Sequence, residues 1–399
     1  MRSKNNQRNT LNRKKFLIKS GTLLTLPLFF EYCNSQSGDR HYGKSGKDPL
    51  LNSEAEGLKE PVLKAINFGI TAPNAHNTQP WKFKILNSNE FLLYVDEKRI
   101  LPITDPLTRQ ICMSQGTFLE TMMIGATGIG FRAEINLFPE GEYSISMVGK
   151  KPVARVLLKP VSNIPSDPLF SEIKDRATNR TKYFGDDLTA ENIKEIDEKS
   201  ARRYSHSSYI LSEQAMHPYF ELFYESMKLE TKNIRIADES RTWFRFSDKE
   251  IFSKRDGISL PGQGVTGIQR WIAEKFFLGP EPEKFHDPKG TDLFLERYKE
   301  TIESAKGIIY WDTKTNTQKD WVQAGMDYAR FQLAITAMGY VIHPMSQILQ
   351  EYPEMADLQK KFAYLTGVKP PSKIQMIVRI GRSDYRYFSP RRRVKEMLV

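Results

Sequence analysis

A short polar segment stiffened by two prolines is the first feature of this sequence whose residue types could do chemistry. Residues 72–81 read Ala-Pro-Asn-Ala-His-Asn-Thr-Gln-Pro-Trp. Asn74, Asn77 and Gln79 carry neutral amides, which both donate and accept hydrogen bonds, and the prolines reduce the entropy lost on binding. Such a segment suits a flat heteroaromatic ring with carbonyls and ring nitrogens. A tight turn, with Trp81 as a core anchor, would explain the same composition.

Two arginine-rich segments could bind an anion. Arg176, Thr178 and Arg180 are spaced two apart, so an extended or turn conformation would point them to one side. A hydroxyl between two guanidinium groups is well suited to bind a phosphate. Alternatively, this segment is a solvated helix end with no ligand. The second segment lies near the C-terminus and consists of Arg391, Arg392 and Arg393. A basic tail is commonly exposed and inert, but this one could also close over an anion bound elsewhere.

The sequence has no pattern typical of a metal site, a nucleophilic triad or a phosphate-binding glycine loop. The six histidines are scattered, and no His-x-x-x-His or Cys pair occurs. Gly262-Gln263-Gly264 lacks the strand–turn–helix context of a dinucleotide fold and is expected to be a structural loop. Of the two cysteines, Cys112 is expected to be a buried structural thiol.

The net charge of +11 does not predict nucleic-acid binding. Residues 1–32 contain seven basic residues and one acid, a net +6, which leaves +5 for residues 33–399. A charge of that size is ordinary for a folded chain of this length. Nucleic-acid binding is therefore excluded as the main function.

The basic N-terminal stretch, followed by an apolar run at 20–30 and then polar sequence, predicts an export signal. The run is too short to cross a bilayer as a helix. Residues 12–19 resemble the twin-arginine export motif, with lysine at the second arginine position. Cys33 stands where a lipoprotein carries its acylated cysteine, but Tyr32 is bulkier than the usual preceding residue; nearby cleavage or an uncleaved apolar anchor are the alternatives. The expected location is the periplasm or cell envelope, with Cys33 as an optional anchor.

Helices alternate with antiparallel strands in the part of the chain that follows a polar tether at 34–55. Apolar spacing predicts a helix over 58–68, a β-hairpin from strands at 81–86 and 91–95, a helix over 114–131 and a strand pair within 143–158. This mixture is typical of an α+β fold.

The later part of the chain contains a long helical stretch between more regular elements. We expect a helical turn at 168–176, a capped helix at 189–199, a helical insertion at about 214–310, an amphipathic helix at 321–338 and a buried strand at 374–380. The insertion could lie as a lid over a pocket.

The two polar segments together resemble the flavin-binding motifs of FMN-dependent nitroreductases. Residues 72–81 are similar to the Ala-Pro-Ser-x-x-Asn-x-Gln-Pro-Trp motif of that family, and residues 176–180 to its Arg-Arg-Ser-x-Arg phosphate motif. In the family the arginine motif comes first, and each FMN is held by motifs from opposite subunits of a dimer. This chain has the motifs in reverse order.

The reversed order implies two nitroreductase-like halves fused in one chain, as in the Acg-type branch, whose members often read Arg-x-Thr-Asn-Arg. The first half would span 56–165 and the second 166–399. They would form an intramolecular pseudo-dimer with one composite flavin site, and the chain would be a monomer.

The resemblance also assigns residues to the flavin. Donors from the second half would hold the FMN phosphate, residues of the first motif would lie against the ring, and a segment after Gly339 would follow the isoalloxazine edge. Ala177 replaces the usual second arginine and removes one phosphate donor. The residues expected to bind FMN are Pro73, Asn74, Ala75, Asn77, Gln79, Arg176, Thr178, Arg180, Pro344, Met345, Ser346, Arg391, Arg392 and Arg393.

The function implied by the resemblance is hydride transfer from NAD(P)H through FMN to a nitroaromatic or quinone-like acceptor. No protein acid or base is then obligatory. One alternative is a flavin-sequestering protein whose cofactor is covered by the insertion, and another is a degenerate fold used as a binding module. Because NAD(P)H is scarce outside the cytoplasm, an exported enzyme would need another electron donor.

Overall fold

The structure is a computed structural model that describes residues 57–399, all of them part of one compact unit. The predicted export signal, the polar tether and Cys33 lie outside the described residues. Among the helices described, none has the length and apolar character required to cross a membrane.

The first half of the described chain is a four-stranded sheet with two helices. Its strands follow the order β1-β2-β4-β3, and every neighbouring pair is antiparallel. The elements, in chain order, are α3 (Pro61–Gly69), β1 (Trp81–Asn87), β2 (Glu90–Val95), α4 (Arg109–Thr127), β3 (Phe131–Leu137) and β4 (Ala154–Pro160).

The second half repeats this plan. Its strands follow the order β5-β6-β8-β7, again with antiparallel pairs throughout. The elements are α5 (Ala190–Ser200), β5 (His206–Ile210), β6 (Gly307–Thr313), α12 (Gln318–Ala337), β7 (Val341–Pro344) and β8 (Lys373–Gly381), with α13 (Ala356–Thr366) added before β8. Helix, strand pair, long helix and strand pair therefore recur in the same order, and each sheet has the same strand arrangement.

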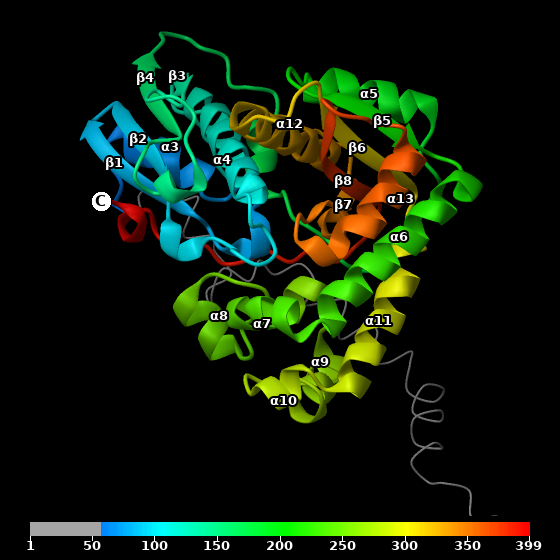
Figure 1. Cartoon of the computed structure of the whole chain (residues 1–399). Helices are drawn as coiled ribbons and strands as arrows, with labels where there is room; N and C mark the ends of the chain where they lie inside the picture. The colour runs from blue at the N-terminus through cyan, green and yellow to red at the C-terminus, as the bar shows by residue number, and fades with distance from the viewer. Residues whose placement is uncertain (1–56) are drawn as a thin grey trace, which may run out of the picture. The chain divides into compact units, whose positions relative to one another are not determined.

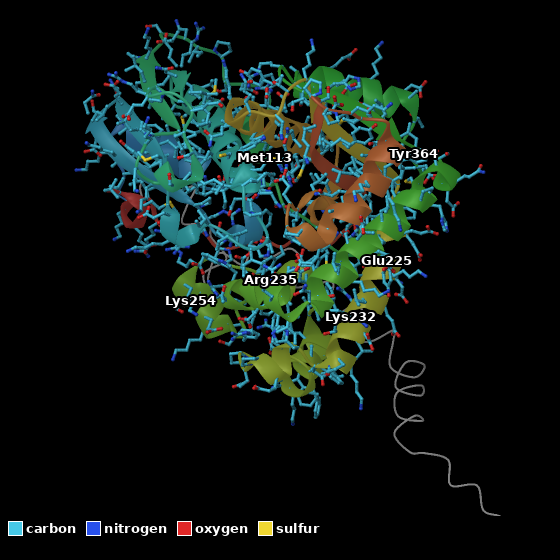
Figure 2. The ribbon with its side chains drawn as sticks, viewed as in Figure 1. Met113, Glu225, Lys232, Arg235, Lys254 and Tyr364 are labelled. Atoms are coloured by element: carbon cyan, nitrogen blue, oxygen red, sulfur yellow. The ribbon has the colours of Figure 1, made fainter. Side chains whose placement is uncertain are left out.

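The long helices α4 and α12 pack against each other at a reciprocal close contact between the halves (Figure 1). A Cβ atom added to Gly116 would lie 1.8 Å from the Val322 carbonyl oxygen, and one added to Gly325 would lie 2.1 Å from that of Met113, which Figure 2 marks. Only glycine permits such an approach. The prediction of an α+β fold built from two fused halves is confirmed.

The helical insertion lies between β5 and β6, where the first half has only a tight turn between β1 and β2. Figure 1 shows its helices α7 to α11 gathered below the two halves. They are α6 (Glu213–Lys232), α7 (Ile234–Trp243), α8 (Asp248–Lys254), α9 (Gly267–Phe276), α10 (Pro282–Phe285) and α11 (Pro288–Ile302). The insertion was predicted at about 214–310; these helices extend from Glu213 to Ile302, and β6 begins at Gly307.

One predicted element of the first half was wrong, and another was confirmed with different bounds. Residues 145–147 form a 3₁₀ turn, so 143–158 contains one strand, β4, which pairs with β3. The chain turns at Gly141 and Gly149, both with positive φ, and this prevents a second strand there. Helix α4 begins at Arg109 rather than at 114, because the Asp105 carboxylate accepts from the backbone N–H groups of its first turn.

The C-terminal tail of the second half crosses to the first. Leu398 forms a parallel bridge with Phe83 of β1, and the Val399 N–H donates to the Phe83 carbonyl at 3.0 Å. The C-terminus accordingly lies beside β1 in Figure 1. The first sheet is completed by a segment that belongs to the other half.

Candidate functional site

One cavity of about 650 Å³ is lined by both halves and by the insertion. Its volume falls in the roughly 300–1,000 Å³ range of sites for small molecules and cofactors. The predicted residues that line it are Pro73, Asn74, Ala75, Asn77, Arg176, Thr178, Arg180, Pro344, Ser346 and Arg391. Four segments that are far apart in sequence therefore meet at one place.

The loop between α3 and β1, which we call the motif loop (residues 70–80), has an unusual backbone. His76, Asn77 and Gln79 have φ values of 49°, 53° and 53°, in the left-handed region that non-glycine residues avoid. Such conformations cost on the order of 1 kcal/mol or more each and persist only where the surroundings fix them.

Helix α4 provides part of what fixes the motif loop. The Ala75 N–H donates to Ser114 Oγ at 3.2 Å, and the indole N–H of Trp81 donates to the Ser114 carbonyl at 3.0 Å. Thr117 Oγ1 donates to the Pro73 carbonyl at 2.6 Å. Trp81 is fully buried, as expected of a core anchor, and the loop is also a cavity wall.

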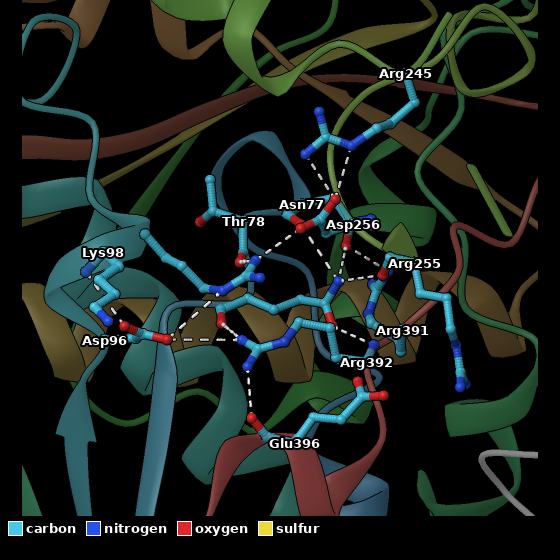
Figure 3. Close-up of polar contacts among 12 residues, drawn as sticks. Asn77, Thr78, Asp96, Lys98, Arg245, Arg255, Asp256, Arg391, Arg392 and Glu396 are labelled. Atoms are coloured by element: carbon cyan, nitrogen blue, oxygen red, sulfur yellow. Dashed lines mark hydrogen bonds and ion pairs between the residues drawn. The ribbon is translucent and has the colours of Figure 1, made fainter. Parts of the chain in front are cut away.

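Asn77 and Gln79 join the motif loop to two other segments, and Figure 3 shows the contact between Asn77 and Arg391. Asn77 Oδ1 accepts from an Arg391 guanidinium N–H at 2.7 Å, and Gln79 Oε1 accepts from the Arg392 backbone N–H at 2.7 Å. Gln79 Nε2 donates to the Arg255 carbonyl in the insertion at 2.8 Å. Gln79 is fully buried and does not line the cavity, so its amide holds the chain together instead of facing the expected ring.

A buried ion-pair group beside this junction was missed from the sequence. Asp256, in the insertion, lies 2.7 Å from an Arg245 guanidinium nitrogen (Figure 3). It also lies 2.8 Å from a guanidinium nitrogen of Arg99 in the first half. These contacts tie the insertion to the first half next to the motif loop. Nothing in the local sequence distinguishes these residues from surface charges.

Arg176 and Arg391 approach the motif loop from the second half. Both donate to the Thr71 carbonyl, at 3.0 and 3.2 Å, and Arg176 also donates to Gln332 Oε1 on α12 at 3.2 Å. Their guanidinium groups therefore lie together in the cavity wall at the end of α3. The arginine segment and the tail, predicted separately, meet there.

Arg180 belongs to a group of three arginines beside the cavity, in which Arg180 and Arg297 are half-buried and Arg379 is fully buried. Its guanidinium donates to the Gly262 carbonyl at 3.2 Å, and that of Arg297 donates to two carbonyls of the same loop at 2.9 Å. Within residues 57–399, neither these arginines nor the fully buried Arg379 has a hydrogen bond or ion pair to an acidic side chain. Burial lowers the pKa of all three, which shows the cost of holding these charges away from water.

The two histidines near Arg180 are held neutral. Burial, followed by the charges of Arg379, Arg180 and Arg297, places the pKa of His343 well below its usual value. Burial and the charge of Arg180 lower the pKa of His76 to about 4, and its Nε2 lies 3.1 Å from Ser240 Oγ. His76 lies in the first half and His343 in the second, so the positive potential of Arg180 reaches both walls of the cavity.

Met345, Arg392 and Arg393 do not line the cavity. Met345 packs in the core with 1% of its surface exposed. Arg392 lies 3.8 Å from Asp96 and donates to the Glu396 carbonyl, whereas Arg393 is exposed and its backbone N–H donates to the Glu396 carboxylate. Of the three terminal arginines, only Arg391 is directed to the predicted site.

Several lining residues were not predicted. The Tyr328 hydroxyl, on α12, is buried and has no hydrogen-bond partner in the described structure, and the charges of Arg176 and Arg180 act on it. His76, Glu230, Tyr298 and His343 also line the cavity. Most of these occupy helix or strand positions that read as core, so periodicity alone could not separate them from packing residues.

The insertion supplies a largely apolar wall. Ile272 and Leu293 line the cavity although 39% and 51% of their surfaces are exposed, so the wall reaches the protein surface there. The other apolar residues of this wall include Phe244, Phe277, Phe285 and Phe294.

Cys112 is not among the residues that line the cavity. It is a buried free thiol, and burial raises its pKa to about 12.

No family model matches the sequence. Among curated proteins, the chain is similar to “Putative NAD(P)H nitroreductase Rv3131” of Mycobacterium tuberculosis, with 26% identity over 140 residues, 35% of this chain and 38% of that protein. It is 35% identical to the uncharacterized protein Rv3127 of the same organism over 86 residues, 21% of this chain and 24% of that protein. Each match thus covers less than two thirds of the relative's length.

Solved structures of similar fold include two nitroreductases named NfnB. The one from Mycobacterium smegmatis, described as FMN-dependent and in complex with NADPH, aligns with a TM-score of 0.35 and 16% identity, covering 56% of this chain and 94% of the other. The one from sphigopyxis sp. strain HMH, described as FMN- and NADPH-dependent, aligns with a TM-score of 0.36 and 12% identity, covering 58% of this chain and 97% of the other. Both TM-scores are below 0.5.

Proposed function

We propose that this chain is an FMN-binding oxidoreductase of the nitroreductase type, with one composite flavin site. It would transfer hydride from NAD(P)H, or electrons from another donor, to a nitroaromatic or quinone-like acceptor. The observation that carries the proposal is the group of Arg180, Arg297 and Arg379, for which the described residues provide no acidic partner. This group lies next to the cavity lined by the motif loop, the arginine segment at 176–180 and Pro344. Cations that are partly or fully removed from water are stabilised by an anion, which the FMN phosphate would supply.

The residues around the cavity fit FMN in three respects. Arg180 and Arg297 line it and offer charged donors for a phosphate. Asn74 and Asn77 line another part of the wall with neutral amides, which suit the carbonyls and nitrogens of an isoalloxazine ring. The buried Tyr328 hydroxyl still requires a hydrogen-bond partner.

Bound FMN would supply the storage and transfer of hydride. The residues of this chain would bind its phosphate, hold the ring between the two halves and exclude water. The apolar wall formed by the insertion suits an aromatic acceptor better than a polar one. Because Ile272 and Leu293 bring this wall to the surface, the insertion favours access over permanent sequestration.

Two measurements on the purified full-length protein test this proposal. The protein should be yellow with bound FMN, and anaerobic addition of NADPH should bleach the flavin absorbance within seconds. A protein that takes up no FMN would refute the proposal. A yellow protein that is not reduced by NADPH, but is reduced by dithionite and reoxidised by a quinone, would show that another donor serves it. Flavin that neither donor nor acceptor reaches would indicate sequestration.

The proposed location is the cell envelope, on the basis of residues 1–33 alone. Fractionation of cells that express the full chain, with Cys33→Ala as a variant, tests it. Loss of membrane association in that variant alone would support lipidation of Cys33. Recovery of both proteins in the cytoplasm would contradict export.

A further inference from the structure

Glu230 is a buried carboxylic acid in the wall of the cavity, and the function proposed above gives it no role. It lies on α6, has 6% of its surface exposed and lines the cavity. Its Oε2 atom has no hydrogen-bond partner within the described residues. Glu225 and Lys232 of the same helix, both marked in Figure 2, have exposed side chains. Glu230 is thus an acid on the inner face of an otherwise ordinary amphipathic helix.

The surroundings of Glu230 contain side-chain amides and another acid, and none of the described cations pairs with it. Burial raises its pKa to about 7; Gln350 and Gln347 oppose the rise, and the carboxylate of Glu239 on α7 adds to it. Tyr298 on α11 and Tyr352 are the other titratable groups within its electrostatic reach. The Glu239 carboxylate is already hydrogen-bonded, because it accepts three hydrogen bonds from residues 103–104 of the first half.

The neighbours of Glu230 place it on the side of the cavity where the reaction would take place. Helix α6 packs against the turn Ser346–Leu349, which is separated from Pro344 only by Met345. Tyr298 is acted on by the charges of both Glu230 and Arg180, and its hydroxyl lies 3.7 Å from Met345 Sδ. The acid therefore lies between the apolar wall of the insertion and the segment expected to follow the flavin edge.

We propose that Glu230 donates the proton that the acceptor takes up together with hydride. This inference rests on the proposed oxidoreductase function. A quinone gains the hydride with its two electrons, one of its oxygens gains the proton as the Glu230 O–H bond breaks, and hydroquinone leaves. The carboxylate then regains a proton from water. An acid with a pKa near the working pH is well suited to both steps.

Rates of the oxidative half-reaction test this role. Glu230→Gln is compared with Glu221→Gln, an exposed control on the same helix. Each protein is loaded with FMN, reduced with one equivalent of dithionite and mixed with 1,4-benzoquinone between pH 5 and 9. The wild-type rate should fall as pH rises through about 7. Glu230→Gln should be slower by roughly 10²-fold at pH 6 and lose this dependence, whereas Glu221→Gln should match the wild type.

A structural defect would slow reduction by NADPH as well, whereas a proton donor to the acceptor would leave that half-reaction unchanged. A Glu230→Gln variant with the wild-type rate and pH profile of reoxidation would overturn the proposal. So would equal slowing of both half-reactions. A protein that binds no FMN would instead refute the proposed function, and the stability measurement below would still test whether Glu230 is protonated.

Thermal unfolding provides a readout that requires no turnover. Because the pKa of Glu230 is raised in the folded protein, the neutral carboxyl favours folding below its ordinary pKa of 4.5, and this contribution is lost as pH rises to about 7. Glutamine is neutral at every pH, so the Glu230→Gln variant does not have this pH-dependent loss of stability. The midpoint of the variant relative to the wild type should therefore rise between pH 5 and pH 8. A constant difference would show that Glu230 is not held neutral and would overturn the proposal.

Discussion

The two halves contain equivalent loops, one between α3 and β1 and one between α5 and β5, and the charges around these loops are satisfied differently. At the cavity, the motif loop between α3 and β1 is held by Ser114 and Thr117 of α4. At the equivalent position, the loop of residues 201–205 between α5 and β5 is held by Asp327 of α12. This carboxylate accepts from the backbone N–H groups of residues 203, 204 and 205 at 2.9, 2.8 and 2.7 Å.

The second position is closed by ion pairs within the chain. Glu120, with 1% of its side chain exposed, binds both Arg203 and Arg330, and Arg330 also lies 3.0 Å from Asp167. In the cavity, by contrast, Arg180 has no acidic partner among the described residues. The arginines beside the loop at 201–205 are thus neutralised by acids of the same chain, whereas the arginines beside the motif loop would be neutralised by a bound anion. This difference explains how two halves would hold a single flavin.

Glu120→Ala should cause the largest effect, because it removes the acid that both arginines of the closed position share. Breaking a buried ion pair leaves charges uncompensated and costs about 3 to 5 kcal/mol of the free energy of unfolding. Denaturant unfolding measures the loss, with Glu134→Ala as a control that removes an exposed ion pair with Lys159. Equal stability of the two variants would mean that the position is not closed by these charges.

Arg180→Ala should weaken FMN binding and leave the stability of the flavin-free protein intact. It removes a charged donor to the expected phosphate, so FMN retention should weaken by about 1.5 to 3 kcal/mol, while the free energy of unfolding of the flavin-free protein should not fall. Equilibrium dialysis measures the affinity, and Arg235→Ala, an exposed arginine paired with Glu354, is the matched control. If Arg180→Ala binds FMN as the wild type does, the phosphate lies elsewhere.

Asn77→Ala should have the smallest effect, and it sharpens the division between binding and holding residues. Asn77 both lines the cavity and accepts a charged hydrogen bond from Arg391. Because Arg391 still donates to three backbone carbonyls of the motif loop, the variant should lose only about 1.5 kcal/mol of stability. Gln79→Ala should destabilise the protein similarly but leave FMN affinity intact, because Gln79 does not line the cavity. A loss of FMN from the Gln79 variant at full stability would contradict this assignment.

Much of the architecture follows from local sequence. The β1–β2 hairpin, the Thr189 cap of α5, the amphipathic α12 and the buried β8 are set by turn residues, capping and apolar spacing, and they were predicted. Residues 143–149 do not form the first strand of the predicted pair, because this apolar–polar alternating segment lies between two glycines at which the chain turns.

The candidate site was predictable only where residues cluster in sequence. The motif loop and Arg176 to Arg180 carry such clusters. Tyr328, Arg297 and Glu230 instead occupy single positions on helices, where apolar neighbours make them resemble core or surface residues. Likewise, only the folded chain reveals that Gln79 binds the tail, because its partners lie 313 and 176 residues away.

Native mass spectrometry of the FMN-saturated full-length protein counts the flavins that each chain holds. We expect one FMN for each polypeptide chain, because one of the two equivalent positions is closed by Glu120 and its arginines. Two FMN molecules per chain, FMN found only in dimers at one per pair of chains, or no FMN at all would contradict it.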